Sequence, residues 1–456
     1  MDSTAQIQIL MDKARAAQAI FEKFNQQQVD AVVKALGKSI FDNARLLAEE
    51  AVAETGMGDV ESKVRKQQGV AMSHWDFVKD KKSVGIIEED PIAQVVTYAK
   101  PIGVIACITP TTNPTSTVCG NGIYAFKSRN AMIVAPHPRS KKVTAHGVAI
   151  ARQAIAEAGG PADLLQVIEE PNIELTQKLM AMSDATIATG GPAMVKAAYS
   201  SGRPSFGVGP GNVQSIIDSG CRDYYDSYAE GTIRCRTTDN GIQCTAEQCL
   251  HLPRPEKEAI LGAFVKFGAV VIEDGAILDR LRAGLFKNGA LNVEMVGKTA
   301  PELAKIFGVP APEDVKVLVV KANGVAPGEI LCKEKLCPVI SYLCYDRFEE
   351  AVANAKANLT DGGAGHSTII FSNDQAHIDL AAKELPVARL SINTPNTIAG
   401  GNSPMIGYNP TISLGCGTWG NNSISENITY RHLMNTTKVG TIIKNASPFN
   451  PDEIWK

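Results

Sequence analysis

The sequence has no long apolar run and no large excess of charge. No stretch approaches the ~20 consecutive apolar residues that span a bilayer. Lys plus Arg (45) nearly balances Asp plus Glu (48), and the formal net charge is −3. A strongly basic chain would favour nucleic acid or an anionic membrane surface as a partner. We therefore expect this chain to bind neither nucleic acid nor a membrane.

The N-terminus lacks the basic start, apolar centre and small-residue cleavage site of a secretory signal peptide. Residues 1–30, MDSTAQIQILMDKARAAQAIFEKFNQQQVD, instead show the apolar spacing of an amphipathic helix. We expect a cytoplasmic protein, and the sequence leaves open whether it enters a bacterial microcompartment.

Cysteine is sparse, with ten residues in 456, and no C-x-x-C pair occurs. Cys235, Cys244, Cys249 and His251 are neighbours in the sequence, but eight, four and one residues separate them. Structural zinc sites use more closely paired ligands. We therefore expect no metal site, and we expect the thiols to remain reduced.

Short apolar runs alternate with helical stretches, which predicts an α/β fold with parallel sheets. Residues 1–80 are expected to be helical, followed by a hairpin that turns near Asp90-Pro91. Because the alternation restarts after Cys244, we expect two α/β lobes with Cys244 near their junction. The predicted strands are 103–108, 131–136, 164–168, 185–189 and 214–218, then 269–273, 315–320, 338–343, 367–371 and 388–393, with a late, isolated candidate at 437–444.

Cys244 follows the Asn-Gly turn signal in TTDNGIQCTAEQC and lies between Gln243 and Thr245. A buried inert thiol is the default interpretation of any enzyme cysteine, and the spacing argues against a metal ligand. The third interpretation is a nucleophile, because a loop before a strand presents a thiol to a cleft beside backbone N–H groups.

Three other segments supply groups that a thiol mechanism needs. Asn113 precedes Pro114 after a strand, where its amide either donates to an oxyanion or serves as a turn residue. Thr189, Gly190 and Gly191 lie between a strand and a helix, which suits close approach to a dinucleotide but lacks the full glycine fingerprint. His366 follows a glycine-rich loop, and a lone histidine is more often structural than catalytic.

Eight motifs occur together between about residues 100 and 427. They are PTTNPTST, PHPRSK, ATGGPAMVKAAYSSGRP, GVGPGN, DNGIQCTAEQ, KEKLCP, GAGHS and LGCGTWGNNSISEN. With these motifs the chain resembles the aldehyde dehydrogenase superfamily, specifically its CoA-acylating branch. It looks most similar to CoA-dependent succinate semialdehyde dehydrogenases and to the acylating half of bifunctional aldehyde-alcohol dehydrogenases.

This resemblance implies a Rossmann-like cofactor-binding domain at 1–235, including an oligomerisation hairpin at 85–100. It further implies a catalytic domain at 236–425 and a C-terminal return segment at 426–456 that carries an oligomerisation strand at 437–444. In the family such segments extend a partner's sheet, so we expect a homodimer or a dimer of dimers.

The resemblance also implies roles for individual residues. Cys244 matches the nucleophile, Asn113 with the Cys244 N–H matches the oxyanion hole, and His366 matches a residue near the CoA thiol. Glu334 matches the residue that holds the nicotinamide ribose. The expected NADP- or NAD-binding positions are Thr109, Pro110, Thr111, His137, Arg139, Ser140, Thr189, Gly190, Gly191, Val195, Gly209, Glu334 and Leu336.

One position departs from the hydrolytic branch of that family. Those enzymes carry a general-base Glu in a Glu-Leu-Gly-Gly stretch, and the matching residue here is Gly207. A thioester at Cys244 is therefore expected to resist water and to await the CoA thiol.

Substrate and cofactor preference remain open at the level of sequence. Gln243 and Thr245 are polar neighbours for the substrate, and Arg234 or Arg236 either clamps an anionic tail, contacts CoA or lies on the surface. Succinate semialdehyde is the leading aldehyde, followed by sulfoacetaldehyde and acetaldehyde. The basic run from Arg139 to Lys142 either receives a 2′-phosphate, which favours NADP, or binds CoA or solvent. An inactive, structural or shell-associated family member is the alternative to an enzyme.

Overall fold

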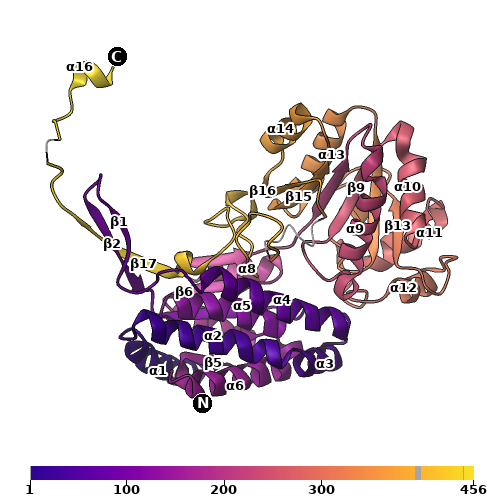
Figure 1. The fold of residues 1–456 in the computed structure, drawn as a ribbon. Helices are drawn as coiled ribbons and strands as arrows, with labels where there is room; N and C mark the ends of the chain where they lie inside the picture. The colour runs from indigo at the N-terminus through magenta and orange to yellow at the C-terminus, as the bar shows by residue number, and fades with distance from the viewer. Residues whose placement is uncertain (1, 396–401, 445) are drawn as a thin grey trace.

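The structure is a computed structural model that describes residues 2–395, 402–444 and 446–456. Two α/β lobes lie side by side (Figure 1). The N-terminal helices and a first sheet form one lobe, and the elements drawn in pink to orange form the other. A hairpin projects from the first lobe next to the C-terminal segment.

The helices of residues 1–80 form as their apolar spacing predicts, and each buries one apolar face. Asn25 starts the second helix with a capping box that it shares with Gln28. The Asp59 carboxylate accepts the N–H of Ser62 and so starts the fourth helix. The bounds are α1 (Ser3–Phe21), α2 (Gln26–Asp42), α3 (Ala44–Thr55) and α4 (Val60–Val78).

A parallel sheet in the order β5-β4-β3-β6-β7 forms the centre of the first lobe. Every residue of β3, β4 and α5 is buried, so this core fixes the loop between β3 and α5. The elements are β3 (Val104–Thr109), α5 (Pro114–Lys127), β4 (Ala131–Pro136), α6 (Lys141–Glu157), β5 (Leu165–Val167), α7 (Ile173–Met182), β6 (Ala185–Thr189), α8 (Pro192–Tyr199) and β7 (Ser205–Val208).

A second parallel sheet in the order β10-β13-β14-β9-β8-β15-β16 forms the other lobe. Helices cover both of its faces, with separate apolar clusters on each. Its strands are β8 (Val213–Ile217), β9 (Glu247–Pro253), β10 (Ala269–Ile272), β13 (Val317–Lys321), β14 (Val339–Tyr345), β15 (Gly365–Phe371) and β16 (Val387–Ile392). Its helices are α9 (Tyr225–Thr237), α10 (Lys257–Lys266), α11 (Gly275–Leu285), α12 (Ala300–Phe307), α13 (Phe348–Asp361) and α14 (Gln375–Glu384).

The change from one sheet to the other comes earlier than the domain boundary expected at residue 235. Strand β8 was expected in the first lobe, but it pairs with β9 and β15 in the second sheet. The chain therefore crosses between lobes at residues 209–212, and α9 packs on the second sheet. The change of sheet at 209–212 differs from the expected boundary at 235 because strand spacing alone does not show which sheet a strand joins.

The hairpin forms where the sequence predicts it, from β1 (Ile86–Asp90) and β2 (Val95–Pro101). The late strand is β17 (Met434–Gly440), which begins and ends earlier than the expected 437–444. It is not isolated, because it pairs antiparallel with β2 to give a three-stranded sheet. The remaining short elements are β11 (Phe286–Lys287), β12 (Ala290–Leu291) and α16 (Pro451–Ile454).

Within the part of the chain that the structure describes, no helix combines the length and apolar character needed to cross a membrane.

Candidate active site

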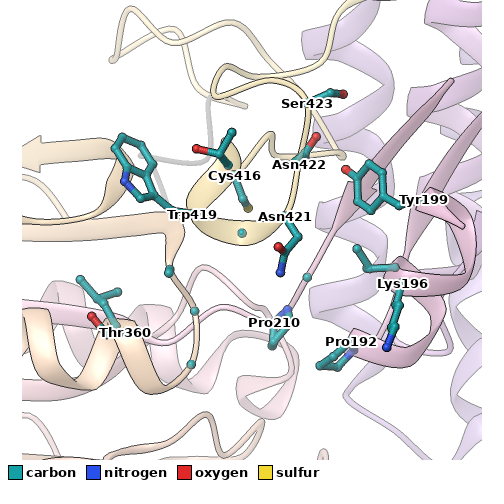
Figure 2. A pocket seen from close by; sticks show the side chains of 18 of the residues that line it. Pro192, Lys196, Tyr199, Pro210, Thr360, Cys416, Trp419, Asn421, Asn422 and Ser423 are labelled. Atoms are coloured by element: carbon teal, nitrogen blue, oxygen red, sulfur yellow. The ribbon is translucent and has the colours of Figure 1, made fainter.

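A cavity of about 820 Å³ lies between the two lobes. Figure 2 shows Pro192, Lys196 and Tyr199 of α8 on one side and the segment from Cys416 to Ser423 on the other. Thr360, near the end of α13, contributes to the wall. The expected cofactor-lining residues Val195 and Gly209 both line this cavity.

Cys244 lies in the turn that joins a short 3-10 helix (Thr238–Gly241) to strand β9. Two residues of that turn, Asp239 (φ 53°) and Asn240 (φ 51°), adopt the left-handed conformation, which Asp and Asn tolerate better than most residues. The amide of Asn240 donates to the carbonyl of Gly297 at 3.0 Å. These contacts hold a tight turn in which Cys244 is partly exposed as a residue.

Gly211 brings four of the sequence motifs together. A Cβ atom at this position would lie 2.1 Å from the carbonyl oxygen of Cys244 and 3.1 Å from Nε2 of His366. The Gly211 N–H donates to Oε1 of Glu334 at 3.2 Å. Cys244, His366 and Glu334 therefore surround one glycine that no larger residue can replace.

The surroundings of Cys244 oppose its ionisation. Burial of the thiol, then the charges of Glu334 and Cys416, raises the pKa of Cys244 to about 12. Arg389 and Lys66 act in the opposite direction. Burial also raises the pKa of Glu334 to about 7, against the Gly211 N–H and the charge of Arg236. At neutral pH the thiol of the free protein is therefore protonated.

His366 is fully enclosed at the start of β15. Neither ring nitrogen has a hydrogen-bond partner among the described residues. Burial, with a contribution from Arg389, lowers the pKa of His366 to about 3. The ring is therefore a neutral imidazole at physiological pH, with one nitrogen able to accept a hydrogen bond.

Asn113 immediately precedes helix α5, and its side chain does not cap that helix. Its Oδ1 accepts a hydrogen bond from Nζ of Lys66 at 2.8 Å, and its Nδ2 donates to Oγ1 of Thr112 at 3.2 Å. The amide is thus oriented by contacts on both sides.

The expected cofactor residues of the first lobe follow its strands. They lie at or after the ends of β3, β4 and β6, and the carboxyl ends of parallel strands share one edge of a sheet. Gly191 and Gly209 have open space where a side chain would stand. The positions are Thr109, Pro110 and Thr111 from the last residue of β3 onward, His137, Arg139 and Ser140 after β4, and Thr189, Gly190 and Gly191 from the last residue of β6 onward.

The basic run after β4 is already engaged with protein groups. Arg139 donates to the carbonyl of Thr55 at 3.1 Å, and Lys141 pairs with Glu170. Ser140 is fully buried. The Glu54 carboxylate accepts the N–H groups of Lys142 and Val143 at 2.9 and 2.8 Å at the start of α6. This region therefore combines cations with a carboxylate at the helix N-terminus.

The two arginines before Cys244 have different environments. Arg234 is exposed in the last turn of α9. Arg236 is completely buried, acts electrostatically on Glu334, and has no hydrogen-bond partner among the described residues. Gln243 and Thr245 flank the nucleophile and are partly buried. Leu336, two residues after Glu334, adopts the left-handed conformation (φ 48°) and packs near Ile242.

Sequence analysis missed four groups at this site. Lys66 and Asp239 form a buried ion pair beside Asn113, and Tyr199 contacts Gly207. Arg389 donates to the His366 carbonyl at 2.8 Å. Asp239 and Tyr199 lie within the motifs DNGIQCTAEQ and ATGGPAMVKAAYSSGRP, so the sequence offered a signal for them. Lys66 and Arg389 lie outside the motifs, and for Lys66 the only signal was its position three residues after Lys63 on one predicted helix.

Within the described ranges, no group of three or more His, Cys, Asp or Glu side chains is placed to hold a metal ion.

The profile described as "Aldehyde dehydrogenase family" matches residues 1–271. A succinate-semialdehyde dehydrogenase (acetylating) of Clostridium kluyveri is 46% identical over 455 residues, covering 100% of both chains. The chain belongs to the aldehyde dehydrogenase family. A sulfoacetaldehyde dehydrogenase of Acholeplasma is 36% identical and covers 97% of this chain and 92% of that one. An acetylating aldehyde dehydrogenase structure from Geobacillus thermoglucosidasius superposes with a TM-score of 0.93 at 35% identity, covering 98% of each chain.

These similarities confirm the aldehyde dehydrogenase-like α/β fold that the motifs predict. They also confirm the placement of this aldehyde dehydrogenase on the CoA-acylating branch of its family. The roles of individual residues stay predictions.

Proposed function

We propose that this aldehyde dehydrogenase converts a short anionic aldehyde and CoA to an acyl-CoA, reversibly and with NADP or NAD. The arrangement of Cys244, Glu334 and His366 around Gly211 carries the proposal, together with the filled space beside Gly207. A nicotinamide cofactor, when bound, accepts the hydride that leaves the substrate carbon.

We assign the cavity between the lobes to the dinucleotide and the CoA chain. Val195 and Gly209 line it, Trp419 offers an aromatic face and is 52% exposed, and Lys196 offers a cation. The Oγ1 atom of Thr189 is buried without a partner among the described residues. Glu334, with its pKa raised to about 7, is positioned to accept a hydrogen bond from a ribose hydroxyl.

Cys244 acts first in the proposed mechanism. Its sulfur, once deprotonated, adds to the aldehyde carbon, and the carbonyl π electrons move to oxygen. The Asn113 amide and the Cys244 N–H hold this oxyanion, and a single such donor contributes roughly 3–4 kcal/mol in other enzymes. Loss of hydride from the same carbon re-forms the carbonyl and leaves a thioester on Cys244.

His366 acts in the second half of the reaction. Its neutral ring accepts a hydrogen bond from the CoA thiol, because burial keeps it uncharged and neither ring nitrogen has a partner among the described residues. The thiol proton passes to the Cys244 sulfur as that sulfur leaves. The CoA sulfur then attacks the thioester carbonyl, and the Cys244 sulfur leaves as the acyl-CoA forms. The Cys244–carbonyl bond breaks as the new carbon–sulfur bond forms, so no redox change occurs in this step.

The position of the general base of the hydrolytic branch supports CoA over water. Gly207 occupies it, and a Cβ there would lie 2.7 Å from Cγ1 of Val195 and 3.0 Å from Cε2 of Tyr199. The protein thus lacks the carboxylate and fills its place with an aromatic side chain. The thioester is expected to persist until CoA arrives.

The proposal that the aldehyde is anionic rests on the substrates for which two similar proteins are named. Succinate semialdehyde carries a carboxylate and sulfoacetaldehyde a sulfonate, and relatives named for each are 46% and 36% identical to this chain. Succinate semialdehyde therefore leads, ahead of sulfoacetaldehyde and the neutral acetaldehyde. Arg234 is exposed, and Arg236 is buried and does not line the cavity. Neither arginine is therefore positioned to bind the anionic end of the aldehyde in this structure.

Cofactor choice depends on the charges at the start of helix α6. Glu54 at the start of α6 offsets the cations that favour NADP, so we propose that both cofactors are accepted. We place the enzyme in the cytoplasm, with a bacterial microcompartment as the alternative.

We further propose a homodimer, or a dimer of dimers, formed through the β1-β2-β17 sheet. Ile92 at the hairpin tip and Ile442 after β17 are 85% and 90% exposed, which is unfavourable unless a second copy covers them. A stable monomer in light scattering at working concentration would contradict this assembly.

The deciding experiment follows NAD(P)H absorbance with succinate semialdehyde, sulfoacetaldehyde and acetaldehyde, each with and without CoA. Acyl-CoA and free acid are quantified in parallel. We expect CoA-dependent acyl-CoA formation that is most efficient with an anionic aldehyde. Rapid acid release without CoA would refute the acylating chemistry, and a clear preference for acetaldehyde would refute the substrate class.

A further inference from the structure

Lys66 of helix α4 joins the two groups on which the proposed chemistry depends. Its Nζ lies 2.8 Å from Oδ1 of Asn113 and 2.5 Å from Oδ2 of Asp239. Asp239 belongs to the turn that presents Cys244, and Asn113 begins helix α5. One ammonium group therefore ties the predicted oxyanion donor to the turn of the nucleophile.

The contact decides which way the Asn113 amide faces. An ammonium group only donates hydrogen bonds, so the atom that Lys66 contacts must be the carbonyl oxygen. The amide NH₂ then points to the opposite side, where one hydrogen is bonded to Thr112 at 3.2 Å. The other hydrogen has no partner among the described residues and is free for a substrate oxygen.

Lys66 is itself held in place from the far side. Its side chain is only 12% exposed, and that of Asp239 is completely buried. The same carboxylate binds Nζ of Lys63 at 3.1 Å and the N–H of Asp59 at 3.1 Å. A buried cation that is paired and hydrogen-bonded in this way cannot rotate away without leaving a buried charge unpaired.

We propose that Lys66 is a positioning residue of the oxyanion site, which fixes the Asn113 amide and polarises it toward the substrate oxygen. A cation on the carbonyl oxygen draws electrons from the amide and strengthens its N–H donors, as linked hydrogen bonds do. Lys66 acts through Asn113, so this inference rests on the proposed function and adds a residue outside the motifs.

The test is a double-mutant cycle on the purified full-length enzyme. Lys66→Met removes the charge and keeps the apolar stem, and Asn113→Ala removes the amide. Loss of one oxyanion donor costs about 10²–10³-fold in kcat in other enzymes. We expect Lys66→Met to lower kcat by about 10- to 100-fold, with KM for aldehyde and CoA changed less than about 3-fold.

The decisive readout is the double variant. If Lys66 acts through Asn113, adding Lys66→Met to Asn113→Ala lowers kcat by less than about 2-fold. Losses that multiply would show an independent role and overturn the inference, as would full kcat in Lys66→Met. Lys63→Met is the matched control, since it removes a cation from the same carboxylate without touching the Asn113 side chain, and we expect a smaller loss than for Lys66→Met.

One further variant and the Asn113→Ala single variant keep the result interpretable. Lys66→Gln, whose amide can still donate to Asn113, replaces Lys66→Met if the latter fails to fold, and we expect a partial loss of kcat that also disappears in the Asn113→Ala background. A multiplicative loss would again overturn the inference. If Asn113→Ala alone retains full turnover, the oxyanion assignment itself fails, which separates the proposed function from the role of Lys66.

Discussion

The hydroxyl oxygen of Tyr199 accepts the backbone N–H of Gly207 at 2.9 Å. The Gly207 carbonyl also accepts a hydrogen bond from the Asn422 amide. This glycine, at the position of the general base in the hydrolytic branch, is therefore held on both sides and screened by an aromatic ring.

Gly207→Glu alone is expected not to create a hydrolytic enzyme. The new side chain would overlap Val195 and Tyr199, and such overpacking typically costs about 1–3 kcal/mol of stability. We expect a lower melting temperature and no rise in acid release without CoA. Adding Val195→Ala and Tyr199→Ala removes both overlaps, so the triple variant is expected to release acid faster than wild type. Rapid acid release by the single variant would contradict this account.

Cys244→Ala is expected to abolish acyl-CoA formation, by at least about 10³-fold, because covalent catalysis loses its nucleophile. Fold and cofactor binding should survive, as checked by circular dichroism and cofactor fluorescence. Cys344→Ala is the matched control, since Cys344 is the other partly exposed cysteine and lies on β14. Substantial turnover in Cys244→Ala would disprove the assignment.

Alkylation of Cys244 in the free enzyme is expected to accelerate about tenfold per pH unit from pH 7 to 10. Burial and the charges of Glu334 and Cys416 raise the pKa of Cys244 to about 12, so the reactive thiolate is scarce throughout that range. Glu334→Gln removes one opposing charge and should increase the rate a few-fold above pH 7, where Glu334 is ionised. The rates are measured with iodoacetamide in the Cys344→Ala background, and a plateau below pH 9 would show a lower thiol pKa.

Stability is expected to fall as the pH drops from about 6.5 toward 4. Burial lowers the pKa of both His74 and His366 to about 3, so below 6.5 the unfolded chain takes up protons that the folded chain refuses. Each histidine then contributes a loss of about 1.4 kcal/mol per pH unit. His74→Leu should flatten this dependence by that amount in denaturant titrations, because it removes one of the two groups. An unchanged slope would indicate that His74 protonates within the fold.

Sequence patterns located most strands because apolar, β-branched runs are buried on both faces of a parallel sheet. Strand β4 occupies the predicted residues 131–136. The pattern failed for β9, EQCLHLP, because buried Gln248 and His251 interrupt the apolar run although all its residues are buried. It also failed for β7, which has only four residues and contains Gly207.

The residues of the candidate site also fall into two groups, those that a sequence pattern identifies and those that only the fold brings into place. Cys244, Asn113, Glu334 and His366 belong to motifs with distinctive local sequence, so they were identifiable before their positions were known. Lys66 has no such motif, because its role depends on the packing of α4 against the turn at Asp239. The sequence also could not show that Arg236 is buried. An arginine eight residues before the nucleophile has the same local sequence whether its side chain is exposed or buried.

Lys66 and Asp239 are separated by 173 residues in the chain. At synthesis rates of ~5–20 residues per second, helix α4 leaves the ribosome roughly 10–35 s before its carboxylate partner. Glu334, His366 and the cavity wall at Cys416 emerge later still. A partly synthesised chain can therefore hold a folded first lobe while containing no complete site, and the enzyme acquires its reactive centre only when the second sheet closes against the first helices.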